Sequence, residues 1–373
     1  MAFNKNKIFM LRYKWLIILS VISMPVFSQQ ASQQNIKYYG REYFLIEGTT
    51  IPESEKESPY DRLPISYKAK VRPPVWDLSK NSAGISIGFL SNSTLIKVKW
   101  GVMNDNKMNH MAETGIKGVD LYCKVDGTWK YINTGRPEGK ENEALLVSTL
   151  APVVREYRMF LPLYDGVSHL EIGIDSVATI EKAVANKYLP IVFYGTSITQ
   201  GGCASRPGMA YSNIISRKLG VDCVNFGFSG NGRMEPPVVE VLAAMQASFY
   251  VIDCVPNMSL EEVQTNVIPL VETIRAKHPK TPIAFVENLQ YAGSFFQNNI
   301  RDDISAKNKA LRAGYDKLIS KGVTNLVYIE SKGGIGDDNE STVDGVHLTD
   351  LGFMRFADYL IAAFKKNNLV ITK

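Results

Sequence analysis

Apolar and polar residues alternate along the first half of the chain. Between residues 94 and 100, Ile96, Val98 and Trp100 share one face of a predicted strand, and the two intervening lysines share the other. Similar alternation recurs twice further along, and turn dipeptides such as Asp126-Gly127 separate the runs. A period of two with one apolar face is typical of antiparallel sheets. We therefore expect an antiparallel β-sandwich, of jelly-roll type, in this half.

The pattern changes near residue 186. Segments with helical spacing now alternate with short apolar runs that are predicted to be buried strands. The runs are Ile191–Tyr194, Cys223–Phe226, Tyr250–Cys254, Ile283–Val286 and Leu326–Ile329. Strands that alternate with helices imply a parallel sheet covered on both faces. We therefore expect an α/β fold class with two domains, a β-sandwich over residues 29–185 and a three-layer α/β/α domain over residues 186–373.

Several helices of the second half have recognisable ends. A helix over residues 211–219 should stop at Gly220, a residue typical of helix C-termini. Ser259 and Glu262 form a capping box before another helix, which Pro269 should kink or divide. A last helix is expected from about Leu351 to Lys366.

Composition and charge narrow the possible functions. Of the 373 residues, 45% are hydrophobic and 21% are charged, so both halves can bury an apolar core. The net charge is +5, and Lys5, Lys7, Arg12 and Lys14 lie near the N-terminus. The remainder is nearly neutral and gives no argument for binding nucleic acid.

The N-terminus has the pattern of an export signal. A basic stretch precedes an apolar run from Trp15 to Phe27, and Val26 and Ser28 are small enough for a peptidase site. The run spans roughly 13 residues, which suits a signal peptide better than a membrane span. We expect a signal peptide over residues 1–28 and a periplasmic or extracellular protein without stable membrane insertion after cleavage. The alternative is a retained membrane anchor.

The four cysteines do not form a recognisable motif. Their spacing matches no zinc site. Export permits disulfides, but burial as small apolar residues is equally compatible with the sequence. No pairing is predicted for Cys123, Cys203, Cys223 and Cys254.

A glycine-flanked serine follows the first buried strand. The segment 195–202 reads GTSITQGG and places Ser197 just beyond the strand. Ligands bind beyond the carboxyl ends of strands in open α/β sheets, so this serine should face substrate. Taken alone, the segment is more typical of a turn serine that caps a helix.

A histidine near the C-terminus supplies the base that a serine nucleophile needs. Of the chain's histidines, His169 falls in a predicted sandwich strand and His278 at a helix end. His347 precedes the last helix, and Asp344 lies three residues before it. That spacing lets the carboxylate accept a bond from Nδ1–H, so that Nε2 faces Ser197, as in a Ser-His-Asp triad.

Ester hydrolysis also requires hydrogen-bond donors for an oxyanion. Two loops qualify by their position after buried strands. Residues 225–232 (NFGFSGNG) offer glycine N–H groups, and residues 253–257 (DCVPN) offer the Asn257 side chain. Considered singly, each is better explained as a loop that satisfies its own backbone.

Four blocks in this order, GTSITQGG, NFGFSGNG, DCVPN and DGVHLTDLGF, resemble those of the SGNH/GDSL hydrolase superfamily. The resemblance implies a flavodoxin-like catalytic domain. It makes Ser197 the nucleophile and first oxyanion donor, Gly230 the second donor and Asn257 the third, with Asp344 and His347 completing the catalytic set. Two departures from the family pattern stand out: Thr196 replaces the usual aspartate, and the third block has Val255 and Met258 in place of glycine and aspartate.

The first half resembles the β-rich companion domain of one bacterial branch of this superfamily. The marker is a Gly-x-Asp-Leu-Tyr motif, here Gly118 to Tyr122. Upstream, His110 or Met111 is a candidate for lining the substrate pocket. Arg206, after the nucleophile, either contacts a polar substrate or forms a structural ion pair.

The resemblance implies a carboxylic ester hydrolase that needs no metal or organic cofactor. The expected substrates are acyl esters, O-acetyl above all, on oligosaccharides or polysaccharides. The alternatives are a lipase acting on acyl lipids, a non-catalytic glycan-binding protein with a retained fold, and an acyltransferase that uses the same acyl-enzyme.

Overall fold

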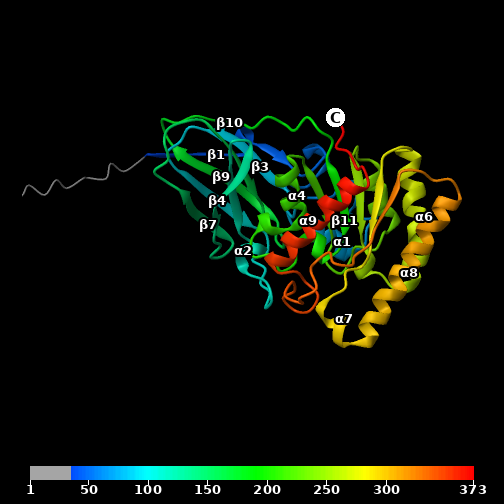
Figure 1. The fold of residues 1–373 in the computed structure, drawn as a ribbon. Coiled ribbons are helices and arrows are strands. Elements are labelled where there is room, and N and C mark those ends of the chain that lie inside the picture. The colour runs from blue at the N-terminus through cyan, green and yellow to red at the C-terminus, as the bar shows by residue number, and fades with distance from the viewer. Residues whose placement is uncertain (1–34) are drawn as a thin grey trace, which may run out of the picture. The chain divides into compact units, whose positions relative to one another are not determined.

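The computed structural model describes residues 35–373, so the expected signal peptide over residues 1–28 lies outside the described part of the chain. Among the residues described, no helix is both long and apolar enough to cross a membrane. Two antiparallel sheets occupy the first half of the described chain and one parallel sheet the second (Figure 1). The predicted α/β fold class, with its additional β-sandwich, is confirmed.

The two antiparallel sheets enclose one apolar core. The first sheet has the order β1-β9-β4-β7, with β1 Ile36–Tyr39, β9 Val167–Asp175, β4 Ile96–Val102 and β7 Glu141–Val147. The second has the order β10-β3-β8-β5-β6, and β2 also pairs with β3. Its strands are β10 Ile180–Lys182, β3 Ser86–Ser91, β8 Arg155–Phe160, β5 Val119–Val125, β6 Thr128–Gly135 and β2 Leu45–Glu47.

The predicted alternation of buried and exposed residues holds in strand β4 but fails in strand β5. In β4, Ile96, Val98 and Trp100 are fully buried, as expected. In β5, however, Asp120 and Tyr122 are also buried, although their alternation with core residues predicts that they are exposed. Their face is covered by the loop that follows Ser197, because Arg206 and Gly208 bind Asp120 there.

The parallel sheet has the order β12-β11-β13-β14-β15. Its strands are β11 Ile191–Gly195, β12 Cys223–Gly227, β13 Phe249–Asp253, β14 Ile283–Val286 and β15 Leu326–Ile329. All five runs predicted from the sequence are strands, with ends that differ by at most one residue. Consecutive residues in β11 enter different cores, since Phe193 belongs to one apolar cluster and Tyr194 to the other.

Helices cover both faces of this sheet (Figure 1). Residues of α4 and α9 contribute to one core, residues of α1, α5 and α6 contribute to the other, and α8 contributes to both. The longer helices are α1 Pro73–Ser79, α4 Tyr211–Leu219, α5 Pro236–Ala243, α6 Leu260–Lys277, α8 Asn298–Ser320 and α9 Asp350–Lys366. The short ones are α2 Glu113–Ile116, α3 Ser197–Gln200 and α7 Ala292–Phe296, with 3-10 turns at Arg41–Tyr43, Glu53–Glu55, Ile65–Tyr67, Pro207–Met209 and Val255–Asn257.

The helix ends follow the local signals. Gly220 ends α4 in the left-handed conformation, with φ 64°. Ser259 Oγ accepts from Glu262 N at 3.1 Å, and Glu262 Oε2 accepts from Ser259 N at 2.7 Å, which confirms the capping box. Helix α6 continues through Pro269, so the proline does not divide it.

A buried arginine joins the first half of the chain to the parallel sheet. The Arg62 guanidinium donates to four backbone carbonyls and has no carboxylate partner among the described residues. The acceptors are Leu78 O (2.6 Å), Asn81 O (2.8 Å), Asn225 O (3.1 Å) and Gly227 O (2.6 Å). Burial lowers the pKa of Arg62 to about 9. Two of the acceptors lie on β12, so this cation holds the strand that ends beside Ser197.

We expect Arg62→Met to destabilise the fold strongly, because the variant leaves four buried carbonyls without their donor. A buried acceptor left without a partner typically costs about 1–3 kcal/mol. Urea denaturation should show this loss of unfolding free energy. Arg136→Met, at an exposed position, is the matched control and should stay close to the parent. Equal stability of the two variants would contradict the structural role of Arg62.

Candidate functional site

Ser197 begins a single helical turn at the carboxyl end of β11. Thr196 caps this turn: its Oγ1 accepts from Ile198 N at 3.2 Å, and its N–H donates to Thr199 Oγ1 at 3.2 Å. Ser197 itself is 7% exposed. The capping threonine occupies the place where the family pattern has aspartate, and its hydroxyl still satisfies the start of the turn.

The nucleophile turn packs backbone to backbone against the loop after β12. A Cβ on Gly232 would lie 2.0 Å from Gly195 O, and a Cβ on Gly227 would lie 2.1 Å from Gln200 N. No side chain fits at either position. Glycine is therefore required at these two places for close approach, which explains most of the glycine content of this block.

Ser197, His347 and Asp344 form a continuous hydrogen-bonded chain. Ser197 Oγ and His347 Nε2 lie 2.9 Å apart, although 150 residues separate them in sequence. His347 Nδ1 lies 2.7 Å from Asp344 Oδ2. Asp344 Oδ1 also accepts from the backbone N–H groups of His347 and Val346, at 2.8 and 3.0 Å.

The electrostatics of Asp344 set the tautomer of the histidine. Burial raises the pKa of this carboxyl, but the hydrogen bonds from the His347 side chain and from the backbone of His347 and Val346 outweigh it, and the net pKa is lowered. An ionised Asp344 holds a proton on His347 Nδ1. Nε2 is then free to accept a proton from Ser197.

The three expected oxyanion donors face one cavity. Ser197, Gly230 and Asn257 all line a pocket of about 430 Å³, together with His347. Asn257 Oδ1 accepts from Gly232 N at 3.3 Å. Because the amide oxygen is engaged there, the amide nitrogen is directed elsewhere, as a donor should be. Neither Gly227 nor Gly232 lines the cavity.

The opposite wall of the cavity was not found from the sequence. It comes from the segment after β14 and from the start of α8, and no motif marks either. The lining residues are Asn288, Tyr291, Ile300, Asp303, Ile304 and Lys307. Lys307 Nζ lies 2.7 Å from Asp303 Oδ2, one helical turn away. The wall therefore combines apolar and charged groups.

A buried carboxyl lies beneath the nucleophile turn. Asp253, at the end of β13, accepts hydrogen bonds on Oδ2 from Tyr211 OH at 3.2 Å and from Thr199 Oγ1 at 3.3 Å. Burial raises the pKa of Asp253 to about 7, against the lowering effect of these two bonds. Through Thr199, this carboxyl supports the turn that carries Ser197.

Asp120 and Tyr122 of the Gly-x-Asp-Leu-Tyr motif bind the loop that follows the nucleophile turn. Asp120 Oδ2 accepts from Arg206 Nη1 at 2.8 Å and from Gly208 N at 2.9 Å. Arg206 Nη1 also donates to Tyr122 OH at 2.5 Å, and its guanidinium lies 4.0 Å from the Tyr131 ring centroid. Arg206 is thus held in an ion pair and does not line the cavity of Ser197.

His110 and Met111, both candidates for the substrate pocket, occupy different environments. The His110 ring is exposed and lies 5.6 Å from the His347 ring, centroid to centroid. Met111 is 6% exposed and packs into an apolar core. Neither residue lines the 430 Å³ cavity, but His110 is close to the candidate base.

The chain matches family models in both halves. A model of the GDSL-like Lipase/Acylhydrolase family matches residues 188–365. A model of the N-terminus of Esterase_SGNH_hydro-type proteins matches residues 36–180. A search of curated proteins gives no match.

Solved structures resemble nearly the whole described chain. A protein from Bacteroides ovatus ATCC 8483, described as a GDSL-like lipase, is 37% identical, with a TM-score of 0.86 over 91% of this chain and 100% of its own. The salicylyl-acyltransferase SsfX3 from a tetracycline biosynthetic pathway is 14% identical, with a TM-score of 0.75 over 91% and 99%. The acetyl xylan esterase Est2A from the rumen bacterium Butyrivibrio proteoclasticus is 11% identical, with a TM-score of 0.57 over 90% and 100%.

The last two likenesses concern the fold alone, whereas the first extends to the sequence. Together with the two family models, it accounts for the parallel sheet, the sandwich and the order of the motifs. The chain therefore belongs to the GDSL-like lipase/acylhydrolase family, whose members are SGNH-type hydrolases.

Proposed function

We propose that this protein is an exported serine esterase that removes short acyl groups, acetyl above all, from carbohydrates. The observation that carries the proposal is the hydrogen-bonded chain from Ser197 through His347 to Asp344 at a cavity lined by Gly230 and Asn257. The basic and apolar N-terminal pattern supports export.

The geometry suits acyl transfer through a covalent intermediate. Ser197 Oγ attacks the ester carbonyl while His347 Nε2 accepts the serine proton. The imidazolium, stabilised by Asp344, then donates that proton to the leaving alcohol. Water attacks the acyl-enzyme with His347 again as the base, which releases the acid and restores the serine.

Charge that develops on the carbonyl oxygen needs donors already in place. The backbone N–H groups of Ser197 and Gly230 and the Asn257 amide fill this role in the proposal. Such donors stabilise the transition state more than the ground state, so their loss should lower kcat.

The cavity favours a small acyl group next to a polar alcohol. A volume of about 430 Å³ is modest, and its wall includes Asp303 and Lys307 beside Ile300. A long acyl chain would need a more extended apolar surface. The fold similarity to an acetyl xylan esterase supports carbohydrate as the alcohol, although fold alone does not determine substrate.

Ser197→Ala should abolish esterase activity, because the variant has no nucleophile. Loss of a triad nucleophile typically lowers kcat by about 10⁶-fold. Acetate release from acetylated xylan, mannan and pectin, and hydrolysis of p-nitrophenyl acetate, measure the effect. Ser320→Ala, exposed at the end of α8, is the matched control and should remain active.

Other results would redirect the proposal. An inactive wild-type protein that binds glycans would favour a non-catalytic binder. Faster hydrolysis of long-chain than of acetyl esters would favour a lipase. Acyl transfer to an added sugar faster than hydrolysis would favour an acyltransferase.

Asn257→Ala should lower kcat by about 10²–10³-fold with little change in KM, as expected for a donor that acts mainly in the transition state. Steady-state kinetics on p-nitrophenyl acetate separate the two constants. Asn367→Ala, exposed after the last helix, serves as the control. A change confined to KM would instead assign Asn257 to substrate binding.

Asp253 should make stability depend on pH in a defined direction. Because its folded pKa is raised to about 7, the neutral acid is favoured in the fold. The stability that neutral Asp253 contributes to the fold is fully present below the unfolded pKa near 4 and is lost as pH rises to about 7. Asp253→Asn keeps a neutral side chain, so its Tm should fall less than that of the wild type from about pH 5 to about pH 8. Parallel Tm profiles would contradict this assignment.

A further inference from the structure

Four potential metal ligands from three segments of the chain meet beside the candidate triad. One ligand atom from each of His110, Cys203, Asp344 and His347 lies within 4.8 Å of the others. Two of these residues belong to the Ser-His-Asp chain, whereas His110 and Cys203 have no role in it. We propose that these four residues form an inhibitory zinc site, which switches the esterase off by capturing the base.

The set of donor atoms favours a transition metal such as zinc. Imidazole nitrogen, thiolate sulfur and carboxylate oxygen are the ligands of Zn²⁺, whereas Mg²⁺ and Ca²⁺ prefer oxygen alone. Zinc binds these atoms at roughly 2.0–2.3 Å, which places tetrahedral ligands roughly 3.3–3.8 Å apart. Ligand atoms at the 4.8 Å limit would have to close by about 1–1.5 Å to reach these separations, and Asp344 Oδ2 and His347 Nδ1, which lie 2.7 Å apart, would have to open by about 0.6–1.1 Å.

His110 is oriented as a ligand by its neighbour. Its Nδ1 lies 3.0 Å from Asn109 Oδ1. The amide oxygen can only accept, so this bond requires a proton on Nδ1 and leaves the Nε2 lone pair free. A second hydrogen bond that fixes the ring and its tautomer is the usual companion of a metal-binding histidine.

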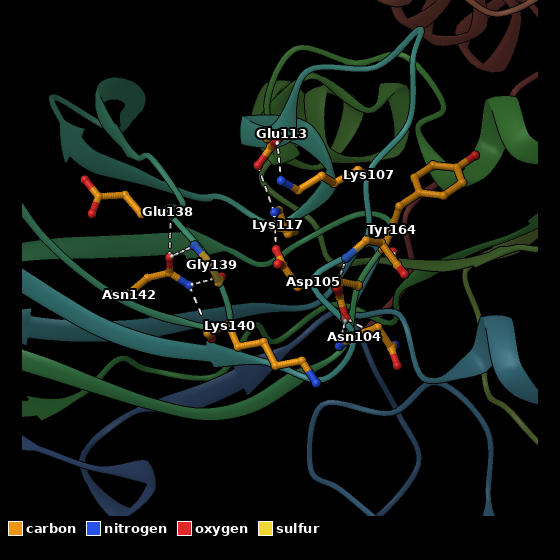
Figure 2. Close-up of polar contacts among 12 residues, drawn as sticks. Asn104, Asp105, Lys107, Glu113, Lys117, Glu138, Gly139, Lys140, Asn142 and Tyr164 are labelled. Carbon is orange, nitrogen blue, oxygen red and sulfur yellow. Dashed lines mark hydrogen bonds and ion pairs between the residues drawn. The ribbon is translucent and has the colours of Figure 1, made fainter.

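The loop that carries His110 is held on both sides. Figure 2 shows Lys117 between Asp105 and Glu113, which flank His110 in sequence, with ion pairs to both. The Lys117 ammonium is fully buried. Further back, Asp165 accepts from the backbone N–H groups of Asn104 and Asn106, both at 3.0 Å. His110 therefore does not have to be recruited from a distant position.

Cys203 keeps a side chain where the backbone favours glycine. Its φ is +71°, in the left-handed region that β-carbons disfavour. The Cys203 thiol is buried. A strained backbone position that carries a thiol towards the triad carboxylate is typical of a functional site more than of a turn.

Coordination at this place would act through the histidine tautomer. Asp344 Oδ2 lies 2.7 Å from His347 Nδ1, and Nε2 is on the opposite side of the ring, bound to Ser197. A metal that shares Asp344 and His347 must therefore use Nδ1. The ring proton then resides on Nε2, the thiol proton leaves to solvent, and Nε2 donates to Ser197 instead of accepting. Ser197 loses its base, as in triads with the wrong tautomer.

Zinc binding can be tested without activity. Calorimetric titration of ZnCl₂ into the chelator-treated full chain should give one saturable site. Cys203→Gly, which also suits the positive φ and should fold, is expected to weaken binding by at least about 100-fold. His110→Ala should weaken it too. Cys123→Ser, at a buried thiol in the sandwich, is the control and should bind as the wild type does. Equal binding by Cys203→Gly and the wild type would overturn the site.

The inhibition itself rests on the proposed esterase function, so it has a separate readout. Zinc should inhibit hydrolysis of p-nitrophenyl acetate by the wild type, and a chelator should reverse this. The ratio of zinc-treated to metal-free rates should approach one in Cys203→Gly. Ser197→Ala should bind zinc normally while inactive. An inactive wild type that binds zinc would refute the esterase and keep the site, whereas equal inhibition of wild type and Cys203→Gly would refute the switch.

Discussion

The close packing of the nucleophile turn against the ends of neighbouring strands is the constraint on which this molecule depends. Backbone atoms at the end of β11 and in the turn touch the end of β12 and the loop after it, with no room for a β-carbon at Gly227 or Gly232. That contact fixes where Ser197 lies relative to Gly230 and Asn257. The site is thus positioned by main chain, and the side chains are added to an already rigid frame.

The sandwich contributes to the same frame although it holds none of the proposed catalytic residues. Asp120 holds the loop after the nucleophile, and Arg62 holds the end of β12 through carbonyls. Both are buried polar groups, and each has partners on the far side of the boundary between the two halves. The contacts of Asp120 explain why strand β5 departs from simple alternation: this carboxylate can be buried because Arg206 and the Gly208 N–H group satisfy it.

Much of the fold could be predicted from the sequence, because buried parallel strands are continuous apolar runs and the helix ends carry capping residues. The long helix α8 was harder to find, since only Ile304, Leu311 and Leu318 are buried along its 23 residues. The association of Ser197 with His347 followed from motif order. The choice of Gly230 among three glycines came from family resemblance, and the cavity wall around Asn288 and Tyr291 carries no local signal, since three-dimensional packing alone brings it to the site.

The four carbonyls gathered by Arg62 also bear on how such proteins are assembled in evolution. Two of those acceptors are on β12 and two are at or just after α1, so the donor and its acceptors would be parted if either half were inherited alone. A hydrolase half transplanted without its companion would expose unsatisfied backbone at the very strand that borders its nucleophile. Recombination should therefore carry the two halves together, as one heritable unit, and shuffling between relatives should succeed only where the arginine and strand β12 come from the same parent.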